Sequence, residues 1–194
     1  MKEKPYAVVF SGVPGTSKSS IADYLSWNFD IGVLRSDSVR YEVKEDMRVE
    51  SLSIGEDLDF HNPNGNGALE EFERRINERR HTILALGKLI ILDGSVDRRW
   101  ESVRQELLQN GYDWFMINME LSEKFLKDLY TGTGRESFIP QLEGYLRDHA
   151  KFLDAYRKEI SLEINDGNFR GRLKIAASGL QNYIESMEEQ SAIG

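Results

Sequence analysis

The stretch GVPGTSKSS, from Gly12 to Ser20, stands between a short apolar run and a segment whose apolar residues have helical spacing. It fits the pattern G-x-x-x-x-G-K-[ST] at every position but one, because Ser17 occupies the place where a glycine usually precedes the lysine. A strand ending in such a loop lets successive backbone N–H groups converge on a phosphate oxygen, and the following helix adds its positive end. The stretch therefore predicts a strand, a phosphate-binding loop and a helix, in that order.

The residues of this loop are all expected to contact a bound nucleotide: Gly12, Val13, Pro14, Gly15, Thr16, Ser17, Lys18, Ser19 and Ser20. Lys18 is placed to reach the terminal phosphates, and the hydroxyl group of Ser19 to bind Mg²⁺. The Cβ atom of Ser17 crowds a place that is normally bare, so we expect the loop to be slightly shifted there. The alternative interpretation is an ordinary glycine-proline turn between a strand and a helix.

The composition sets broad bounds on the class of protein. The chain has 194 residues and a net charge of −8, which fits one α/β domain and disfavours a protein that coats nucleic acid. It has no cysteine and only three scattered histidines, so metal sites built on nitrogen or sulfur are not expected. The apolar run near the N-terminus is too short for a secretory signal, and no later run is long enough to span a bilayer. We expect a cytoplasmic protein with no membrane partner.

Short apolar runs alternate with helical patterns along the whole chain, which predicts a parallel sheet with helices on both faces. The expected strands are residues 6–11, 31–36, 88–93, 112–119 and 160–165. One expected helix begins near Ser19, and another spans Leu173 to Met187. Three more carry the apolar residues between Leu69 and Leu84, between Trp100 and Leu108, and between Leu142 and Tyr156. No internal repeat or flexible linker divides the chain, so one domain over residues 1–194 is expected.

Two acidic residues follow predicted strands and are candidates for chemistry. Asp37 and Arg40 follow the second strand and share a helix face if a helix begins there, so a carboxylate that accepts a hydroxyl proton would stand beside a guanidinium that holds an anion. Asp93 ends the third strand, where it is placed to bind Mg²⁺ through water. The alternatives are a helix cap with a surface arginine at the first position and an Asp-Gly turn at the second.

Residues 56–67 and 130–140 are rich in glycine, asparagine and proline and are predicted to be loops. Arg135, in the second of them, is a candidate lid residue, because phosphoryl transfer needs positive charge and exclusion of water. The segment 41–66, with Phe60 and His61, is expected either to shape an acceptor pocket or to be a mobile surface loop. Arg98 and Arg99 either reach the acceptor side of the crevice or form a surface pair at the start of a helix.

Five segments taken together resemble the P-loop kinases related to polynucleotide kinase and zeta toxin: GVPGTSKSS, RSDSVR, KLIILDGSVDRRW, WFMINMEL and GRESFIPQLEGYLRDHAKFL. They are also similar to predicted kinases labelled AAA-type ATPases and to 2-phosphoglycerate kinases. The resemblance follows the chain in order from residue 6 to residue 185, and the phosphate loop is its most specific part. It implies a P-loop NTPase fold with the nucleoside-kinase-like strand order 2-3-1-4-5.

The resemblance also implies an activity, the ATP-dependent phosphorylation of a hydroxyl group on a small molecule, a nucleoside or a polynucleotide 5′ end. Its site residues would be Lys18 and Ser19 for ATP and Mg²⁺, Asp37 as general base, Arg40 for the acceptor, Asp93 for the metal and Arg135 in a lid near residues 130–141. The alternative is an ATP-binding or ATP-hydrolysing regulatory or toxin-like module without a dedicated acceptor. The preference between ATP and another NTP, the acceptor and the oligomeric state are left open.

Overall fold

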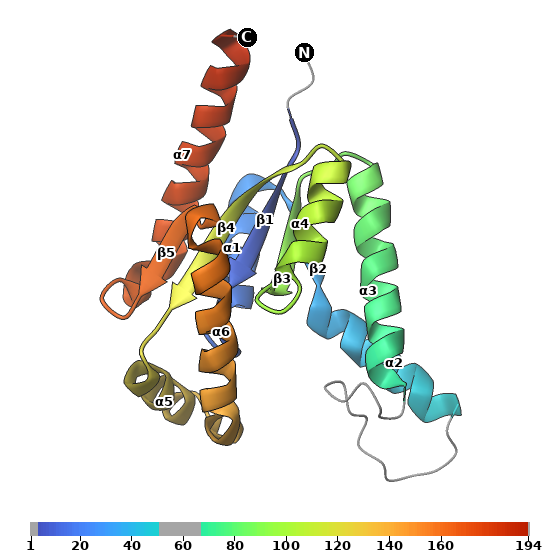
Figure 1. Ribbon diagram of the computed structural model, residues 1–194, viewed down its shortest axis with the longest axis vertical. Helices are drawn as coiled ribbons and strands as arrows, with labels where there is room; N and C mark the ends of the chain where they lie inside the picture. The colour runs from blue at the N-terminus through green and yellow to red at the C-terminus, as the bar shows by residue number, and fades with distance from the viewer. Residues whose placement is uncertain (1–3, 51–66, 194) are drawn as a thin grey trace.

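The computed structural model describes residues 4–50 and 67–193 and contains one five-stranded sheet (Figure 1). The strands are β1 (Tyr6–Ser11), β2 (Gly32–Arg35), β3 (Ile90–Ser95), β4 (Asp113–Glu120) and β5 (Leu162–Asn165). They are parallel and lie in the order β2-β3-β1-β4-β5. The predicted α/β P-loop NTPase fold and its strand order are therefore confirmed.

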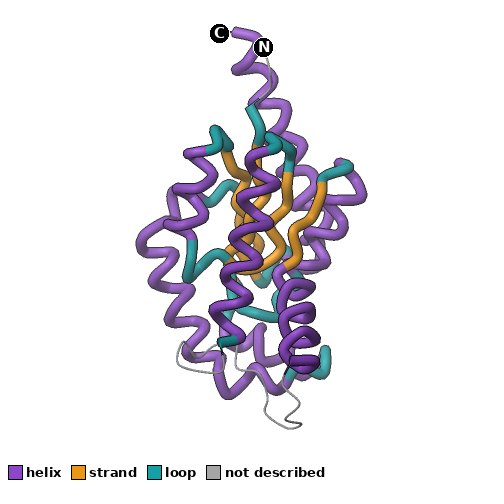
Figure 2. The backbone as a smooth tube through the Cα atoms, turned by 90° about the vertical axis from the view of Figure 1, so that its right-hand side faces the viewer, coloured by secondary structure: helices purple, strands orange, loops and turns teal. Residues whose placement is uncertain are grey.

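Helices cover both faces of this sheet, as the side view shows (Figure 2). They are α1 (Lys18–Phe29), α2 (Ser36–Glu50), α3 (Ala68–Ala85), α4 (Trp100–Gln109), α5 (Glu123–Gly132), α6 (Leu142–Tyr156) and α7 (Arg172–Ile193). There are also three short 3₁₀ segments. The first, η1 (Glu136–Gln141), follows α5, the second, η2 (Arg157–Glu159), follows α6, and the third, η3 (Phe169–Gly171), precedes α7. Helices α1 and α7 pack on one face, and α3 and α4 pack on the other.

The central strand β1 explains why its sequence is a continuous apolar run. Tyr6, Val8 and Phe10 belong to the core on the side of α1 and α7, whereas Ala7 and Val9 belong to the core on the opposite side. All of these residues are buried, because a parallel strand with helices on both faces has no solvent-facing side. The strand then ends at the phosphate loop, at the edge of the sheet where β2 and β3 also end (Figure 1).

The segment 41–66, expected to shape a pocket or to be a mobile loop, and the predicted loop 130–140 are both partly helical. Residues 41–50 belong to α2, and buried Val39 and Val43 stand one helical turn apart, a signal that the prediction overlooked. In the segment 130–140, the first three residues close α5 and Glu136–Gln141 forms η1, so only residues 133–135 match the predicted loop. Residues 51–66, which include Phe60, His61 and all of the predicted loop 56–67 but Gly67, lie outside the described residues. Within the described ranges, no helix has the length and apolar character needed to cross a membrane.

Helix α4 offers a direct test of the core, because two adjacent leucines on it have opposite surroundings. Leu107 is completely buried, whereas Leu108 is 50% exposed. We expect Leu107→Ala to lower the free energy of unfolding by about 2–5 kcal/mol, since it leaves a cavity among large side chains. The matched control Leu108→Ala is expected to change it by at most about 0.5 kcal/mol. Urea denaturation measures both, and similar losses from the two variants would contradict the placement of α4.

Candidate functional site

The phosphate loop runs from Gly12 to Ser17 and contains three residues with positive φ angles. Gly12 has a φ of 122°, and a Cβ atom there would lie 2.7 Å from the Cβ of Met119, so the position has room only for glycine. Gly15 has a φ of 76°. Ser17 has a φ of 68°, a left-handed conformation that costs a residue with a Cβ atom about 1–2 kcal/mol. This conformation explains why glycine is usual at the position of Ser17.

Lys18 is the first residue of α1, and its ammonium group lies inside the loop. Its Nζ atom donates hydrogen bonds to the carbonyl oxygens of Gly12 at 2.8 Å and Val13 at 2.6 Å. Burial lowers the pKa of Lys18 to about 8, although the carboxylates of Asp97, Asp93 and Asp37 all act to raise it. The charge of Lys18 is thus held at the loop with three acidic side chains around it.

Ser19 and Asp93 form the second part of the site. The hydroxyl group of Ser19 donates to Oδ1 of Asp93 at 3.0 Å, which joins the start of α1 to β3. Burial raises the pKa of Asp93, whereas the bond from Ser19 and the nearby charge of Arg35 lower it. Two oxygen ligands side by side fit Mg²⁺, which takes few protein ligands and completes its coordination with water and phosphate oxygens. The described residues contain no cluster of three His, Cys, Asp or Glu side chains that would hold a metal without such help.

Asp37 lies in the first turn of α2, as the sequence predicted for a helix starting after the second strand. Its side chain is 87% exposed, and Oδ1 lies 3.5 Å from Nη1 of Arg40. Arg40 is not an ordinary surface arginine, because its guanidinium lies 5.0 Å from the centre of the Phe72 ring. Asp37 is also close enough to influence the titration of Lys18 and Asp93. The structure therefore brings this predicted pair to the mouth of the phosphate loop.

The segment after α5 contacts the phosphate loop directly. Nη1 of Arg135 donates to the carbonyl oxygen of Gly15 at 3.3 Å, and the hydroxyl group of Tyr130 donates to that of Pro14 at 2.6 Å. Burial raises the pKa of Tyr130 to about 12, so its hydroxyl group keeps its proton at neutral pH. Phe138 completes this contact, since a Cβ atom added to Gly15 would lie 3.3 Å from its ring. Arg135 therefore lies against the phosphate loop, and its role as a lid residue stays a prediction.

Sequence reasoning missed a buried pair formed by Asp97 and His149. The backbone N–H of Gly12 donates to Oδ1 of Asp97 at 3.1 Å, and Nδ1 of His149 lies 2.9 Å from Oδ2. Both side chains are more than nine-tenths buried. Asp97 follows Asp93 by four residues, just past the same strand, and this second acid at the carboxyl edge of the sheet was the available signal. Its contact with His149 on α6 is a tertiary feature that spacing does not predict.

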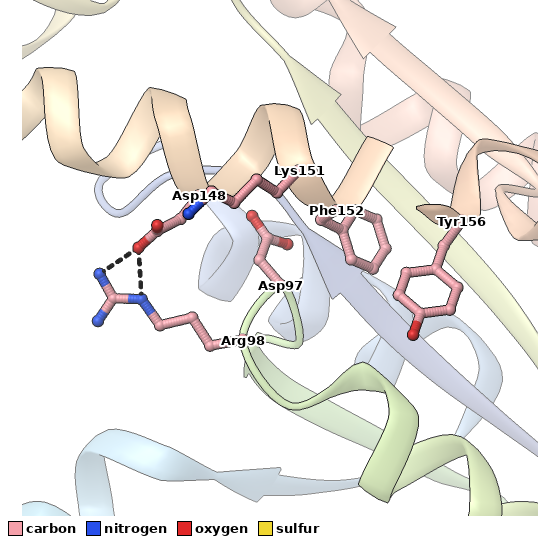
Figure 3. A pocket seen from close by; sticks show the side chains of 6 residues that line it. All are labelled: Asp97, Arg98, Asp148, Lys151, Phe152 and Tyr156. Atoms are coloured by element: carbon pink, nitrogen blue, oxygen red, sulfur yellow. Dashed lines mark hydrogen bonds and ion pairs between the residues drawn. The ribbon is translucent and has the colours of Figure 1, made fainter. Parts of the chain in front are cut away.

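A cleft of about 390 Å³ opens beside Asp97, between the start of α4 and helix α6 (Figure 3). Its lining residues combine two aromatic rings, two cations and two carboxylates: Asp97, Arg98, Asp148, Lys151, Phe152 and Tyr156. At one end of the cleft, Nε of Arg98 donates to Oδ2 of Asp148 at 2.8 Å. Because Asp97 also accepts the N–H of Gly12, the cleft adjoins the phosphate loop.

Comparison with solved structures identifies P-loop kinases with the same fold. A gluconokinase from Sinorhizobium meliloti 1021 has a TM-score of 0.62 and 18% identity, covering 98% of this chain and 99% of that one. A shikimate kinase from Acinetobacter baumannii, in complex with shikimate, has a TM-score of 0.56 and 17% identity, covering 95% and 96%. The APS kinase CysC of Mycobacterium tuberculosis has a TM-score of 0.54 and 16% identity, covering 93% and 99%.

At these identities the likeness establishes the fold that this chain shares with P-loop kinases. No protein-family model matches the sequence. No curated protein matches it either.

The buried Asp97–His149 pair gives a prediction with a pH signature. Asp97→Asn is expected to lower the free energy of unfolding by about 1–3 kcal/mol at pH 7, because one amide oxygen replaces a carboxylate that accepts two hydrogen bonds. Burial alone would raise the pKa of Asp97, but the hydrogen bond and charge of His149 hold that pKa below its ordinary value of 3.8. A lowered pKa adds stability above the unfolded-state pKa, and that stability is lost as the pH falls through the folded-state value.

The stability difference between the parent protein and Asp97→Asn should therefore shrink below about pH 4. Urea denaturation between pH 7 and pH 3 measures this difference. The control is Asp148→Asn. Asp148 precedes His149 in the sequence and forms a partly exposed ion pair with Arg98, so this change is expected to lower the free energy of unfolding by at most about 1 kcal/mol. A loss with Asp97→Asn that stays constant over the pH range would show that the carboxylate is not involved.

Proposed function

We propose that the protein is an ATP-dependent kinase that transfers the γ-phosphoryl group to a hydroxyl group of an acceptor. The observation that carries this proposal is the meeting of four groups at one edge of the sheet: the buried ammonium of Lys18, the bonded Ser19–Asp93 pair and the carboxylate of Asp37. A phosphate-binding loop alone also fits switches and motors, but an exposed carboxylate beside the terminal phosphates supplies a base for an incoming alcohol.

In the proposed reaction, the acceptor oxygen attacks the γ-phosphorus while the bond from that phosphorus to the β–γ bridging oxygen breaks, and ADP leaves. The carboxylate of Asp37 takes the proton of the attacking hydroxyl. Lys18 binds the terminal phosphate oxygens, and Ser19 with Asp93 would hold Mg²⁺, which when bound neutralises charge on the β- and γ-phosphates. The protein mainly contributes placement and charge compensation, because phosphoryl transfer requires little covalent help.

Arg135 has a separate role in this proposal. Its present bond to Gly15 ties the segment 130–141 to the phosphate loop, so the guanidinium already stands beside the place where the phosphates would lie. With Tyr130 on Pro14, it lets that segment act as a lid that excludes water during transfer. We accordingly treat residues 1–194 as a single kinase domain with its lid near residues 130–141.

The structural neighbours support a small-molecule acceptor over a polynucleotide end. The three compared structures are a gluconokinase, a shikimate kinase and an APS kinase. A polynucleotide would also need a basic groove along its backbone, which a chain with a net charge of −8 disfavours. The competing proposal, an ATP-hydrolysing regulatory module, requires no acceptor and no base at Asp37.

Removal of Lys18 tests the nucleotide part of the proposal. Lys18→Ala is expected to weaken ATP binding by at least about 10-fold, because a charge-assisted contact to phosphate is worth about 1.5–3 kcal/mol. Calorimetric titration with ATP and Mg²⁺ measures the affinity. The control Lys124→Ala removes an exposed lysine of α5 and should leave it unchanged. Equal affinities in the two variants would rule out the phosphate loop as the ATP site.

Asp37 is tested by separating binding from turnover. Asp37→Asn is expected to keep the ATP affinity within about 3-fold and to lower acceptor-dependent ADP release by about 10²–10⁴-fold, the usual contribution of a general base. ADP release with and without a panel of hydroxyl compounds provides the measurement. Asp46→Asn, on the same helix and also exposed, is the matched control. If no hydroxyl compound stimulates the parent protein, the regulatory module is the better interpretation.

A further inference from the structure

Arg99, the residue that precedes α4, is a half-buried arginine without an acidic partner. Its guanidinium lies 5.6 Å from the centre of the Phe72 ring. Within residues 4–50 and 67–193, its side chain makes no hydrogen bond or ion pair. Arg98, the residue before it, is in contrast exposed and paired with Asp148 at 2.7 Å. The two adjacent arginines therefore differ in kind, and only Arg98 behaves as an ordinary surface residue.

Arg40 contacts the same aromatic ring, so two guanidinium groups share Phe72. Nε of Arg40 is buried and has no hydrogen-bond partner, and its contact with Asp37 is a single 3.5 Å approach to an exposed carboxylate. These two arginines come from α2 and from the turn before α4, elements that are far apart in sequence. Each guanidinium retains N–H groups that no acceptor among the described residues satisfies.

The electrostatics agree with this lack of partners. Burial is the largest effect on Arg99, and with the nearby charges of Arg40 and Arg80 it lowers the pKa of Arg99, against a smaller opposing effect of Glu73. Arg80 is itself paired, since its Nη2 donates to Asn77 at 3.0 Å and its Nε donates to Glu106. A partly buried positive charge beside like charges is a cost to the folded protein, and such costs are typical of binding sites.

A small cavity lies next to these charges. It has a volume of about 40 Å³ and is lined by two arginines, one serine and five aliphatic residues: Leu34, Ile76, Arg80, Leu92, Ser95, Val96, Arg99 and Val103. Ser95 is the last residue of β3, so the cavity reaches the edge of the sheet at which the phosphate loop also lies. Its size suits one small polar group, and its apolar walls would strengthen any charge pairing inside it.

We propose that Arg99 and Arg40, with Arg80 beneath them, bind an oxyanion group, a carboxylate or a phosphate, that the acceptor alcohol carries. The planar fork of a guanidinium matches both groups with two parallel hydrogen bonds. Asp37, one turn before Arg40 on α2, would then face the hydroxyl group of the same molecule. That the oxyanion belongs to an acceptor alcohol rests on the proposed kinase function, whereas the binding of an oxyanion at Arg99 does not.

The first experiment measures anion binding without nucleotide. All proteins carry Lys18→Ala, which removes the ammonium of the phosphate loop, and inorganic phosphate and acetate are the two probes. Phosphate, acetate or both should raise the melting temperature of the Lys18→Ala protein, and the effective probe identifies the preferred group. Adding Arg99→Met should weaken the apparent affinity for that probe by about 10-fold or more. The matched variant with Arg98→Met should keep it. The same probe dependence in both double variants, or no response to either probe, would overturn the proposal.

A second readout separates binding from structure. Arg99→Met removes an uncompensated charge and keeps a long apolar side chain over Phe72, so the variant without ligand should melt at the same temperature as the parent protein or higher. If Arg99 had a structural role, its removal would lower the melting temperature. A variant that melts at a lower temperature or does not fold would therefore overturn the proposal. Arg99→Lys, which keeps the charge but lacks the fork, should bind the effective probe more weakly than the parent.

The third readout distinguishes failure of this proposal from failure of the kinase proposal. If ATP binds to none of the proteins but the anion response still requires Arg99, the kinase function is wrong and the oxyanion site stands. If a hydroxyl acceptor is found, Arg99→Met should raise its KM by about 10-fold or more while leaving the KM for ATP unchanged. An acceptor KM that is insensitive to Arg99 would contradict the site.

Discussion

The burial of one ammonium group is the constraint on which the candidate site depends. Lys18 sits inside its own loop, where it is held by two backbone carbonyl oxygens. A pKa lowered from 10.5 to about 8 corresponds to about 3 kcal/mol of bias toward the neutral amine. The three carboxylates around it oppose this bias, so they keep the group charged at neutral pH. Asp93 and Asp97 stand at or just past the end of β3 and Asp37 at the start of α2, so the adjacency of β2 and β3 brings them together.

The same argument explains why β1 has to lie in the middle of the sheet. Asp93 pairs with Ser19 only because β3 is adjacent to β1, and Asp37 is within electrostatic reach only because β2 is adjacent to β3. The contact of Gly12 with Met119 of β4 fixes the other side of the loop. The loop is therefore held between its neighbouring strands, and a left-handed conformation at Ser17 is tolerated inside this frame.

The sequence predicted the parts of this structure that depend on local pattern and missed those that depend on tertiary contact. The apolar run of β1 and the glycines of the loop have unambiguous local causes, and both were predicted at the correct positions. Helix α2 was considered only as a possible helix start at Asp37, because its polar residues hide the spacing of Val39 and Val43. The pairing of Asp97 with His149 joins residues 52 positions apart, and no local pattern indicates it.

Charged side chains are distributed differently around Lys18 and around Phe72. Carboxylates surround Lys18, where a polyanionic nucleotide would bring its own negative charge together with a divalent cation. Two arginines meet instead at Phe72: Arg40, which contacts Asp37, and Arg99, which has no ion pair with any described residue. In the proposed reaction a phosphoryl donor and an anionic acceptor would repel each other, so each would need its own compensating cations. Asp37 is linked to both groups of cations, since it influences the titration of Lys18 and contacts Arg40, so in the proposed reaction the base would stand near both charged partners. Because the whole chain has a net charge of −8, these cations are local exceptions and not part of a basic surface.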